Sequence, residues 1–428
     1  MEYNLKIVFG NLNKGEIITM IVFSVLCFFF AINGQGELLV ALMLLFSCLG
    51  FFNHLGMALG AIIIAGSFVT QLSTGFFYAL SYVPFLLASF YKMVNKGLGA
   101  NPFVAFVFGL VLVFLSYLLG VEPDIIVLLL QIISMAVFYT ISSSFNQNDV
   151  AIAVFSYLCS GLLMFLFINT GGLLSNIDSG RLAFGENVKG IAYSCSIPLV
   201  FLVFSFLDRS YLFDNFARKK YIRIVDIVLI VIFLLIIFMT LARGLMLALV
   251  IGVVLLSLLT KKSGKSIFII VIGAVLAILV FNYVESLDVF RTERLFATEE
   301  YSTGNGRTEI WKHHIREISS LGSRYVVLGI GPGNVARVSM IEGYAHSMIL
   351  DYYFSYGILG FLFFVIVEIV TLKRMFKRSN IIPFVVVVTY LIAYSTHGGA
   401  ANPPFFILQG LMLANIKFFD KCATINHQ

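Results

Sequence analysis

The sequence predicts an all-α polytopic membrane protein with about fourteen transmembrane helices, twelve to fourteen in all, and one large loop outside the bilayer. Of the 428 residues, 60% are hydrophobic and only 12% are charged, whereas soluble domains are about 25% charged. Apolar runs of spanning length follow one another along the chain. The one long polar interval, residues 285–346, interrupts them.

The expected spans follow in order from these apolar runs. They cover residues 17–33, 38–53, 56–72, 75–91, 102–121, 124–142, 150–172, 187–207, 222–241, 243–260, 266–284, 347–371, 380–396 and 404–419. The chain then has three parts, which are a helical region at 1–284, the loop at 285–346, and a second helical region with a short tail at 347–428. No small-residue cleavage site follows the first apolar run, so it is expected to be an anchor rather than a cleaved signal peptide.

The distribution of basic residues predicts the orientation. With the N-terminus placed inside, most lysines and arginines of the short loops fall on the cytoplasmic side, as the positive-inside rule expects. Both termini are then cytoplasmic, and the net charge of +6 needs no nucleic-acid partner. Three basic residues on the outer side break the pattern, namely Arg181, Lys189 and Arg243. Charges kept against an insertion bias are candidates for function.

The large loop on the outer face carries most of the polar motifs. Arg307 and Trp311 belong to GRTEIW at 306–311, and Gly331 and Gly333 lie in GIGPGN at 329–334. His346 comes directly before an apolar helix. The glycine run lacks the spacing of a dinucleotide fingerprint, and the carboxylates show no hard-cation cluster. We therefore expect chemistry without a metal or a cofactor.

Residues 307–321 predict an amphipathic helix at the outer interface. Trp311, Ile315 and Ile318 fall on one stripe at helical spacing, with the basic residues off that stripe. His313 and His314 are adjacent, so they point in different directions on a helix and make a poor metal pair. The segment 325–328 is expected to be either extended or a short buried piece.

The polar residues have functional and structural interpretations that the sequence leaves open. Arg181, Arg243 and Arg307 offer planar forks of donors that suit an anionic, lipid-carried pyrophosphate, or they extend to lipid phosphates and pair with glutamates. An imidazole such as His346 accepts a proton from a hydroxyl at neutral pH, or it caps its helix. The glycine run either lets backbone approach a phosphate or forms a tight packing loop.

Taken in order, these motifs resemble the O-antigen ligase and polymerase superfamily. They are an Arg-x-x-x-Gly-x-Asn stretch from Arg181 to Asn187, the Arg243–Gly244 pair, the Gly-Arg-x-x-x-Trp motif, the Gly-x-Gly-x-Gly run, and His346 ahead of the helix that contains YGILG at 356–360. The similarity covers roughly residues 181–360. The earlier helices match only in being hydrophobic.

The resemblance implies a GT-C-like bundle in a bacterial inner membrane with a periplasmic active site. It implies an inverting, metal-independent transfer of a glycan held on undecaprenyl pyrophosphate. Arg243 and Arg307 would bind the pyrophosphate, Arg181 would assist with the lipid-linked substrate, and His346 would be the base. Supporting roles would fall to Asn187, Trp311, Gly331, Gly333 and Asp351. Membrane lipids, a flippase and a chain-length regulator would be its partners.

Two departures from the family pattern bear on the reaction. Ala242 stands where a serine commonly precedes the arginine, and Ser347 stands where the ligases often have asparagine. The second favours a polymerase of O-antigen, capsule or exopolysaccharide repeat units over a ligase that transfers glycan to a lipid A core. A lipid-linked oligosaccharide flippase is the alternative of a different class. A transporter would place charges at the bilayer midplane, whereas the informative charges here lie at the outer boundary.

Overall fold

The structure is a computed structural model of the chain. It describes residues 12–72, 75–96, 100–121, 124–170, 177–178, 181–182, 188–208, 220–260, 278–279, 282–283, 286, 307–334, 347–376, 381–397 and 402–425. This part of the chain is helical apart from one short antiparallel ribbon of β1 (Ile177–Asp178) and β2 (Arg181–Leu182). The all-α prediction is confirmed for the described residues, with that ribbon as a small addition.

The helices follow the apolar runs of the sequence. In chain order they are α1 (Lys14–Ile32), α2 (Gly36–Ser47), the 3-10 helix η1 (Cys48–Phe52), α3 (Leu55–Leu72), α4 (Gly75–Leu80), α5 (Tyr82–Lys96), α6 (Ala100–Leu119), α7 (Ile125–Ser144), α8 (Gln147–Thr170), α9 (Val188–Asp208), α10 (Lys220–Met239), α11 (Arg243–Thr260), α14 (Arg307–Ser320), α15 (Ser323–Leu328), α17 (Met348–Phe376), α18 (Ile382–His397) and α19 (Pro403–Ile425).

Thirteen of the fourteen expected spans coincide with these helices, and the remaining one, 266–284, lies mostly outside the described residues. Within the described part of the chain, five helices are suited by length and composition to cross a membrane: Lys14–Ile32, Phe76–Asn95, Ile125–Ser144, Gln147–Thr170 and Met348–Phe376. Eight further apolar helices are shorter. These are the helices of an integral membrane protein, while the number of spans and the GT-C-like arrangement stay predictions.

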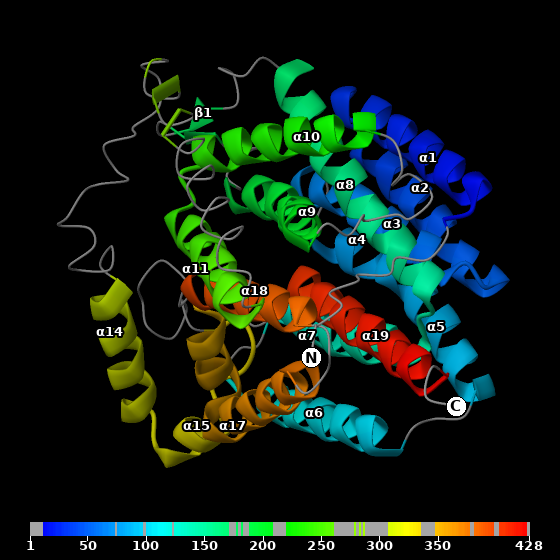
Figure 1. The fold of residues 1–428 in the computed structure, drawn as a ribbon. Helices are drawn as coiled ribbons and strands as arrows, with labels where there is room; N and C mark the ends of the chain where they lie inside the picture. Colours follow the sequence, from blue (N-terminus) through cyan, green and yellow to red (C-terminus); the bar gives the residue numbers. More distant parts are fainter. Residues whose placement is uncertain are drawn as a thin grey trace.

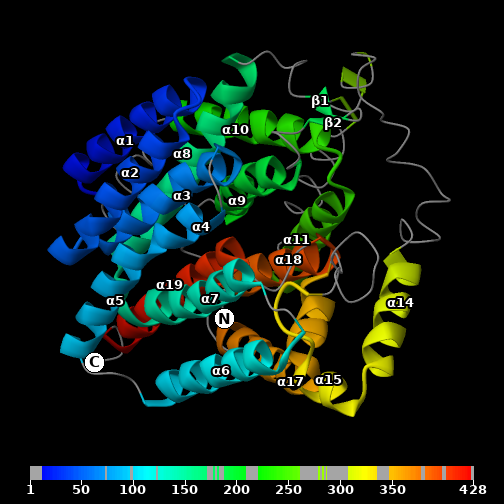
Figure 2. The ribbon, with the colours of Figure 1, turned by 180° about the vertical axis from the view of Figure 1, so that it is seen from behind.

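The bundle is built around α3, α8, α7 and α19 (Figures 1 and 2). Helix α3 packs on α8, α2 and α1, and α7 packs on α19. Helices α9, α10, α11 and α18 form a neighbouring group, and α17 joins it by packing on α18. Apolar side chains also point outward, for example Leu118 (73% exposed) and Leu258 (72% exposed). Exposed apolar surface of this kind suits a lipid environment.

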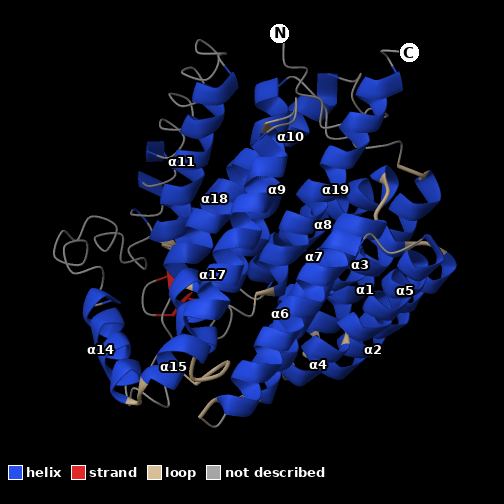
Figure 3. Cartoon of the chain, turned by 90° about the horizontal axis from the view of Figure 1, so that it is seen from below, coloured by secondary structure: helices blue, strands red, loops and turns tan. Residues whose placement is uncertain are grey.

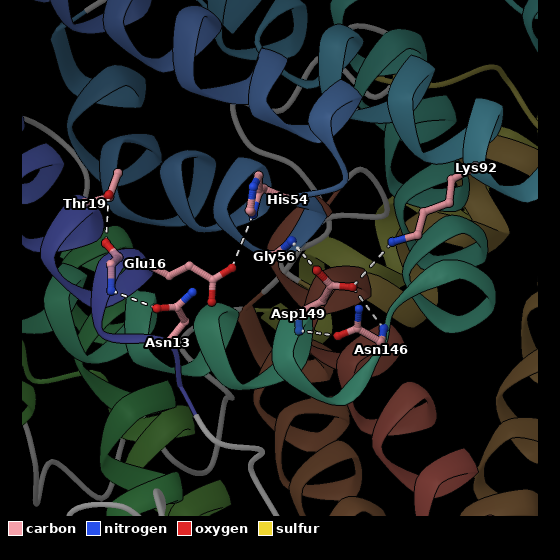
Figure 4. A network of polar contacts seen from close by, with 9 residues as sticks. Asn13, Glu16, Thr19, His54, Gly56, Lys92, Asn146 and Asp149 are labelled. Carbon is pink, nitrogen blue, oxygen red and sulfur yellow. Dashed lines mark hydrogen bonds and ion pairs between the residues drawn. The ribbon is translucent and has the colours of Figure 1, made fainter.

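A polar network joins one end of the bundle, at the starts of α1, α3 and α8 (Figure 4). The Asp149 carboxylate is 3% exposed and accepts hydrogen bonds from the backbone N–H of Gly56 (2.9 Å) and of Asn146 (3.0 Å). Lys92 Nζ lies 3.8 Å from the same carboxylate. A buried carboxylate needs such partners. The network therefore fixes α8 to α3 and α5 at the end that is predicted to face the cytoplasm.

The segment with the candidate site residues lies at an edge of the molecule. Helices α14 and α15 are on the side away from α1, α2 and α5 in all three views of the fold (Figure 3). Helix α15 contacts α17 and α6, and α14 contacts α15 and α17. The candidate site is thus attached to the bundle through α6 and α17.

Candidate active site

The first feature of the site is a break in α17 at Gly357. Its backbone angles, φ 64° and ψ −165°, are not helical, and this region of backbone conformation is nearly confined to glycine. A regular helix would use the carbonyls of Phe354 and Ser355 for its own next turn. The break instead leaves both carbonyls free to accept hydrogen bonds from another segment.

The glycine-rich loop at 329–334 supplies the donors. The N–H of Ile330 donates to the carbonyl of Phe354 (3.0 Å), and the N–H of Gly331 donates to the carbonyl of Ser355 (3.1 Å). The approach is so close that a Cβ on Gly357 would overlap Val327, and a Cβ on Gly329 would overlap the carbonyl of Ser355. Gly329 of the glycine-rich loop and Gly357 of the YGILG motif must therefore be glycines, because the two segments are too close together for a side chain at either position.

The other side of this loop is fixed to the connection between α6 and α7. The backbone N–H groups of Val121 and Asp124 donate to the carbonyls of Ile330 (2.9 Å) and Pro332 (3.1 Å). Ser116 Oγ donates to the carbonyl of Leu328 (2.7 Å). These bonds join residues about 200 positions apart in sequence, and they hold the loop between α17 and the end of α6.

Helix α14 docks on this assembly through a small apolar cluster. Ile318 of α14, Ile330 of the loop and Phe354 of α17 are its buried members. The ring of His314 is 0% exposed and lies edge-on to Phe354, with the ring centroids 5.5 Å apart. The amphipathic helix is thus confirmed, but its predicted stripe is partly wrong. Ile315 is 42% exposed, because His314 takes the position against α17 instead.

The ring of His314 is enclosed by protein. Neither ring nitrogen has a hydrogen-bond partner among the residues that the structure describes. Burial lowers the pKa of the His314 imidazole below its ordinary value, and the neighbouring His313 lowers it further. The ring is therefore neutral at physiological pH.

Arg307 and Ser347, the residue that follows His346 in the sequence, lie at the starts of two neighbouring helices. Arg307 is the first residue of α14, and Trp311, one turn later, is half-buried. His346 lies outside the described residues, but Ser347, which follows it, is buried and accepts a hydrogen bond from the N–H of Leu350 (3.4 Å) at the start of α17. Since α14 packs on α17, the helices that begin at these two motifs are in contact.

Arg243 begins α11 directly after a strained turn. Leu241 has a left-handed φ of 49°, which costs a leucine about 1–2 kcal/mol. The N–H of Arg243 donates to the Leu241 carbonyl (2.9 Å), and Arg243 is half-buried. Helix α11 packs on α18, and α18 packs on α17. Strain of this kind is often found at functional sites, so the turn supports Arg243 as a candidate.

The remaining candidates occupy different settings. Arg181 lies in β2, which contacts α10, the helix that precedes Arg243. Gly331 is buried in the loop contact, and Gly333 is exposed. Asp351 is half-buried in the first turn of α17, where its N–H donates to the Ser347 carbonyl (2.9 Å). Asn187 lies outside the described residues.

Two contacts of the site could not have been read from the motifs. Arg324 belongs to none of the motifs, but its guanidinium donates to the carbonyl of Leu119 (2.7 Å) and so joins α15 to α6. Gly120 has no motif around it, yet a Cβ there would come within 2.9 Å of the Gly331 Cα. Both partners are far away in sequence, so no local pattern shows these contacts.

Comparison with known proteins agrees with the motifs. Residues 228–365, less than half of the chain, match the family model described as O-antigen ligase. No curated protein and no solved structure that was compared with the chain matched it. The match includes Arg243, Arg307 and His346, but not Arg181. The predicted resemblance is confirmed for this segment: from residue 228 to residue 365 the chain is similar to the O-antigen ligase family.

Proposed function

We propose that the chain is a glycosyltransferase that joins lipid-linked oligosaccharide repeat units into O-antigen, capsule or exopolysaccharide. Its substrates are glycans on undecaprenyl pyrophosphate, used as donor and acceptor at the periplasmic face of a bacterial inner membrane. Both termini are cytoplasmic in this proposal, and residues 285–346 form the periplasmic loop between the two helical regions. The outer membrane–water boundary is where a lipid-anchored pyrophosphate would present its glycan.

One observation carries the proposal. The helix that begins at Arg307 is docked on the helix that begins directly after His346, and the glycine-rich loop braces both. The start of the Arg307 helix and the residues that follow His346 therefore lie on contacting elements, which supports assigning the arginine to the anionic leaving group and the histidine to the hydroxyl. Groups held in a fixed relation lower the entropic cost of a two-substrate reaction.

The proposed chemistry is an inverting displacement. His346 accepts the proton of the acceptor hydroxyl while the hydroxyl oxygen attacks the anomeric carbon of the donor sugar from the face opposite the pyrophosphate. The bond between that carbon and the phosphate oxygen breaks, and undecaprenyl pyrophosphate leaves with the bonding electron pair. A positioned base of this kind contributes about 10²–10⁴-fold to a rate.

The arginines act on the leaving group. Negative charge grows on the pyrophosphate as the bond breaks, and guanidinium groups stabilise it through charge-assisted hydrogen bonds. We assign this role to Arg243 and Arg307, with Arg181 assisting the lipid-linked substrate. Asn187, Trp311, Gly331, Gly333 and Asp351 are proposed as supporting residues. A flippase would deliver the repeat units, and a chain-length regulator would limit the polymer.

A ligase is the second candidate, because the family model that matches the chain is described as O-antigen ligase. The chemistry and the residues are the same, and only the acceptor differs, since a ligase transfers the finished glycan to a lipid A core. Ser347, in place of the asparagine frequent in ligases, supports the polymerase.

Deleting the gene and analysing the glycan separates the two functions. A core that carries a single repeat unit is the expected result and shows the loss of a polymerase. Free lipid-linked polymer would show the loss of a ligase instead. Absence of outward-facing repeat units would refute both, because it is the result expected for a lost flippase.

A further inference from the structure

Burying the His314 ring costs free energy, because the apolar residues around it offer its nitrogens no hydrogen bond. It is fully buried against Phe354 on α17, and neither nitrogen is paired within the described part of the chain. A buried polar atom without a partner destabilises the state in which it is buried. A phenylalanine or leucine would fill the same apolar cluster without that penalty. Polarity at this position is therefore useful only if the ring leaves the cluster.

Helix α14 is attached in a way that permits such a departure. Its neighbour α15 is fixed to α6 through Ser116 and Arg324 and continues into the braced loop. By contrast, the buried contact of α14 is the cluster around His314 and Ile318. Between α14 and α15 lies Gly322, with φ 114° and nothing within 4 Å of the place where a Cβ would stand. The backbone at Gly322 therefore has free space around it.

We propose that His314 is a positioning residue: its uncharged ring latches α14 onto α17, and α14 leaves α17 about the hinge at Gly322 when the ring gains a charge. The helix that moves begins at Arg307, so the latch sets the position of that arginine. This consequence rests on the proposed function, in which Arg307 binds the pyrophosphate of the donor. The latch itself does not depend on that function.

The direction of the pH effect follows from the burial of the ring. The docked state holds a neutral imidazole with a lowered pKa, whereas a released ring returns to about 6.5. The released state therefore binds more protons, and docking strengthens as pH rises. Docking is complete above about pH 6.5 and weakens as the pH falls below that value.

Other ionisable groups near the cluster do not reverse the direction of this pH effect on the docking of α14. Those that border the cluster, or stand next to one of its members in the chain, include His313 and Glu317 on α14, Arg324 and Tyr325 on α15, and Asp351 and Tyr353 on α17. A charged His313 would further disfavour a charge on His314, and Arg324 is exposed and bonded to α6.

The chain contains its own reporter. Trp311 is the single tryptophan and lies on α14, one turn before His314. Its emission maximum and its quenching by acrylamide report how exposed α14 is, when excitation at 295 nm avoids the tyrosines. The full-length protein is measured in nanodiscs between pH 5 and pH 8, with far-ultraviolet circular dichroism to verify that the bundle stays helical.

Four proteins are compared. In the wild type we expect shielded emission at pH 8 and a red shift with several-fold stronger quenching at pH 5. His314→Phe should stay shielded at both pH values, and His314→Asp should be released already at pH 8. His313→Gln is the matched control and should respond like the wild type. The latch is refuted if His314→Phe shows the acid red shift, or if His314→Asp stays shielded.

Activity with a lipid-linked repeat unit separates the latch from the function. We expect the KM for the donor to rise several-fold at pH 5.5 in the wild type but not in His314→Phe, which a purely structural role of the ring would not produce. If no variant transfers sugar at any pH, the proposed function fails. The tryptophan emission still decides the latch in that case.

Discussion

Replacing Gly357 with alanine should open the contact between the glycine-rich loop and α17. Gly357 has φ 64° and ψ −165°, and an alanine in this region of backbone conformation costs about 1–3 kcal/mol. Its Cβ would also overlap the Val327 carbonyl and stand 2.6 Å from the backbone nitrogen of Gly329. Both neighbours are backbone atoms, so the two segments must separate rather than adjust a side chain.

The free energy by which the contact weakens follows from the hydrogen bonds that this separation breaks. Two hydrogen bonds join the segments, from Ile330 to Phe354 (3.0 Å) and from Gly331 to Ser355 (3.1 Å), and each contributes about 1 kcal/mol. With the backbone cost, the contact should weaken by about 3–5 kcal/mol. This corresponds to a rise of about 10²–10⁴-fold in the population of the opened state.

Hydrogen exchange measures this opening directly. The amide protons of Ile330 and Gly331 are protected by the bonds to α17 and exchange when the contact opens. Peptides that cover 325–334 should therefore exchange about 10²–10⁴-fold faster in Gly357→Ala. Exchange in the α3–α8 core should stay unchanged, because the contact is remote from it.

Gly322→Ala is the matched control. Gly322 also has a backbone conformation nearly confined to glycine, with φ 114° and ψ 164°, but nothing lies within 4 Å of the added Cβ. The Gly322→Ala variant should lose only the free energy of the strained backbone conformation, about 1–3 kcal/mol. The amides of Ile330 and Gly331 should stay protected in this variant. If Gly357→Ala exchanged no faster than Gly322→Ala at these amides, the reasoning from close approach would be refuted.

Three further predictions concern the reaction. His346→Ala should lower polymer formation at least about 10²-fold while the protein stays inserted, and normal polymer in that variant would remove the base assignment. Arg307→Ala should lower kcat/KM for the lipid-linked donor by about 10²–10³-fold, whereas Arg316→Ala, an exposed arginine on the same helix, should stay near the wild type; equal losses would mean that the charge of α14 acts generally. Arg243→Lys should raise the donor KM about tenfold or more, because an ammonium group cannot reproduce a bidentate fork, and an unchanged KM would exclude that contact.

The sequence predicted the helices well because the signal is local. A run of about 20 apolar residues forms a helix in a bilayer whatever lies around it. The amphipathic helix α14 was also predictable from the helical spacing of Trp311 and Ile318. The mistaken choice of Ile315 shows the limit of such spacing. Two stripes on the same helix fit the helical period, and Phe354 of another helix selects the one that includes His314.

The glycine-rich loop shows the same limit at the level of the site. Its sequence was compatible both with a phosphate contact and with tight packing. The structure shows that the amide of Gly331 is bonded to α17 and that the loop is held by α6 and α7. The break at Gly357 creates the acceptors for this bond, and nothing near residue 331 indicates it.

The sequence alone determined that this is a helical membrane protein with a long polar loop, and that its motifs resemble the O-antigen ligase and polymerase superfamily. Both conclusions depend on composition and spacing within short stretches. Only the tertiary structure decided which motifs touch: α14 on α17, the loop against the α17 break, and Ser116 on Leu328. These contacts join segments far apart in the chain, so their geometry depends on how the helices pack rather than on any local pattern.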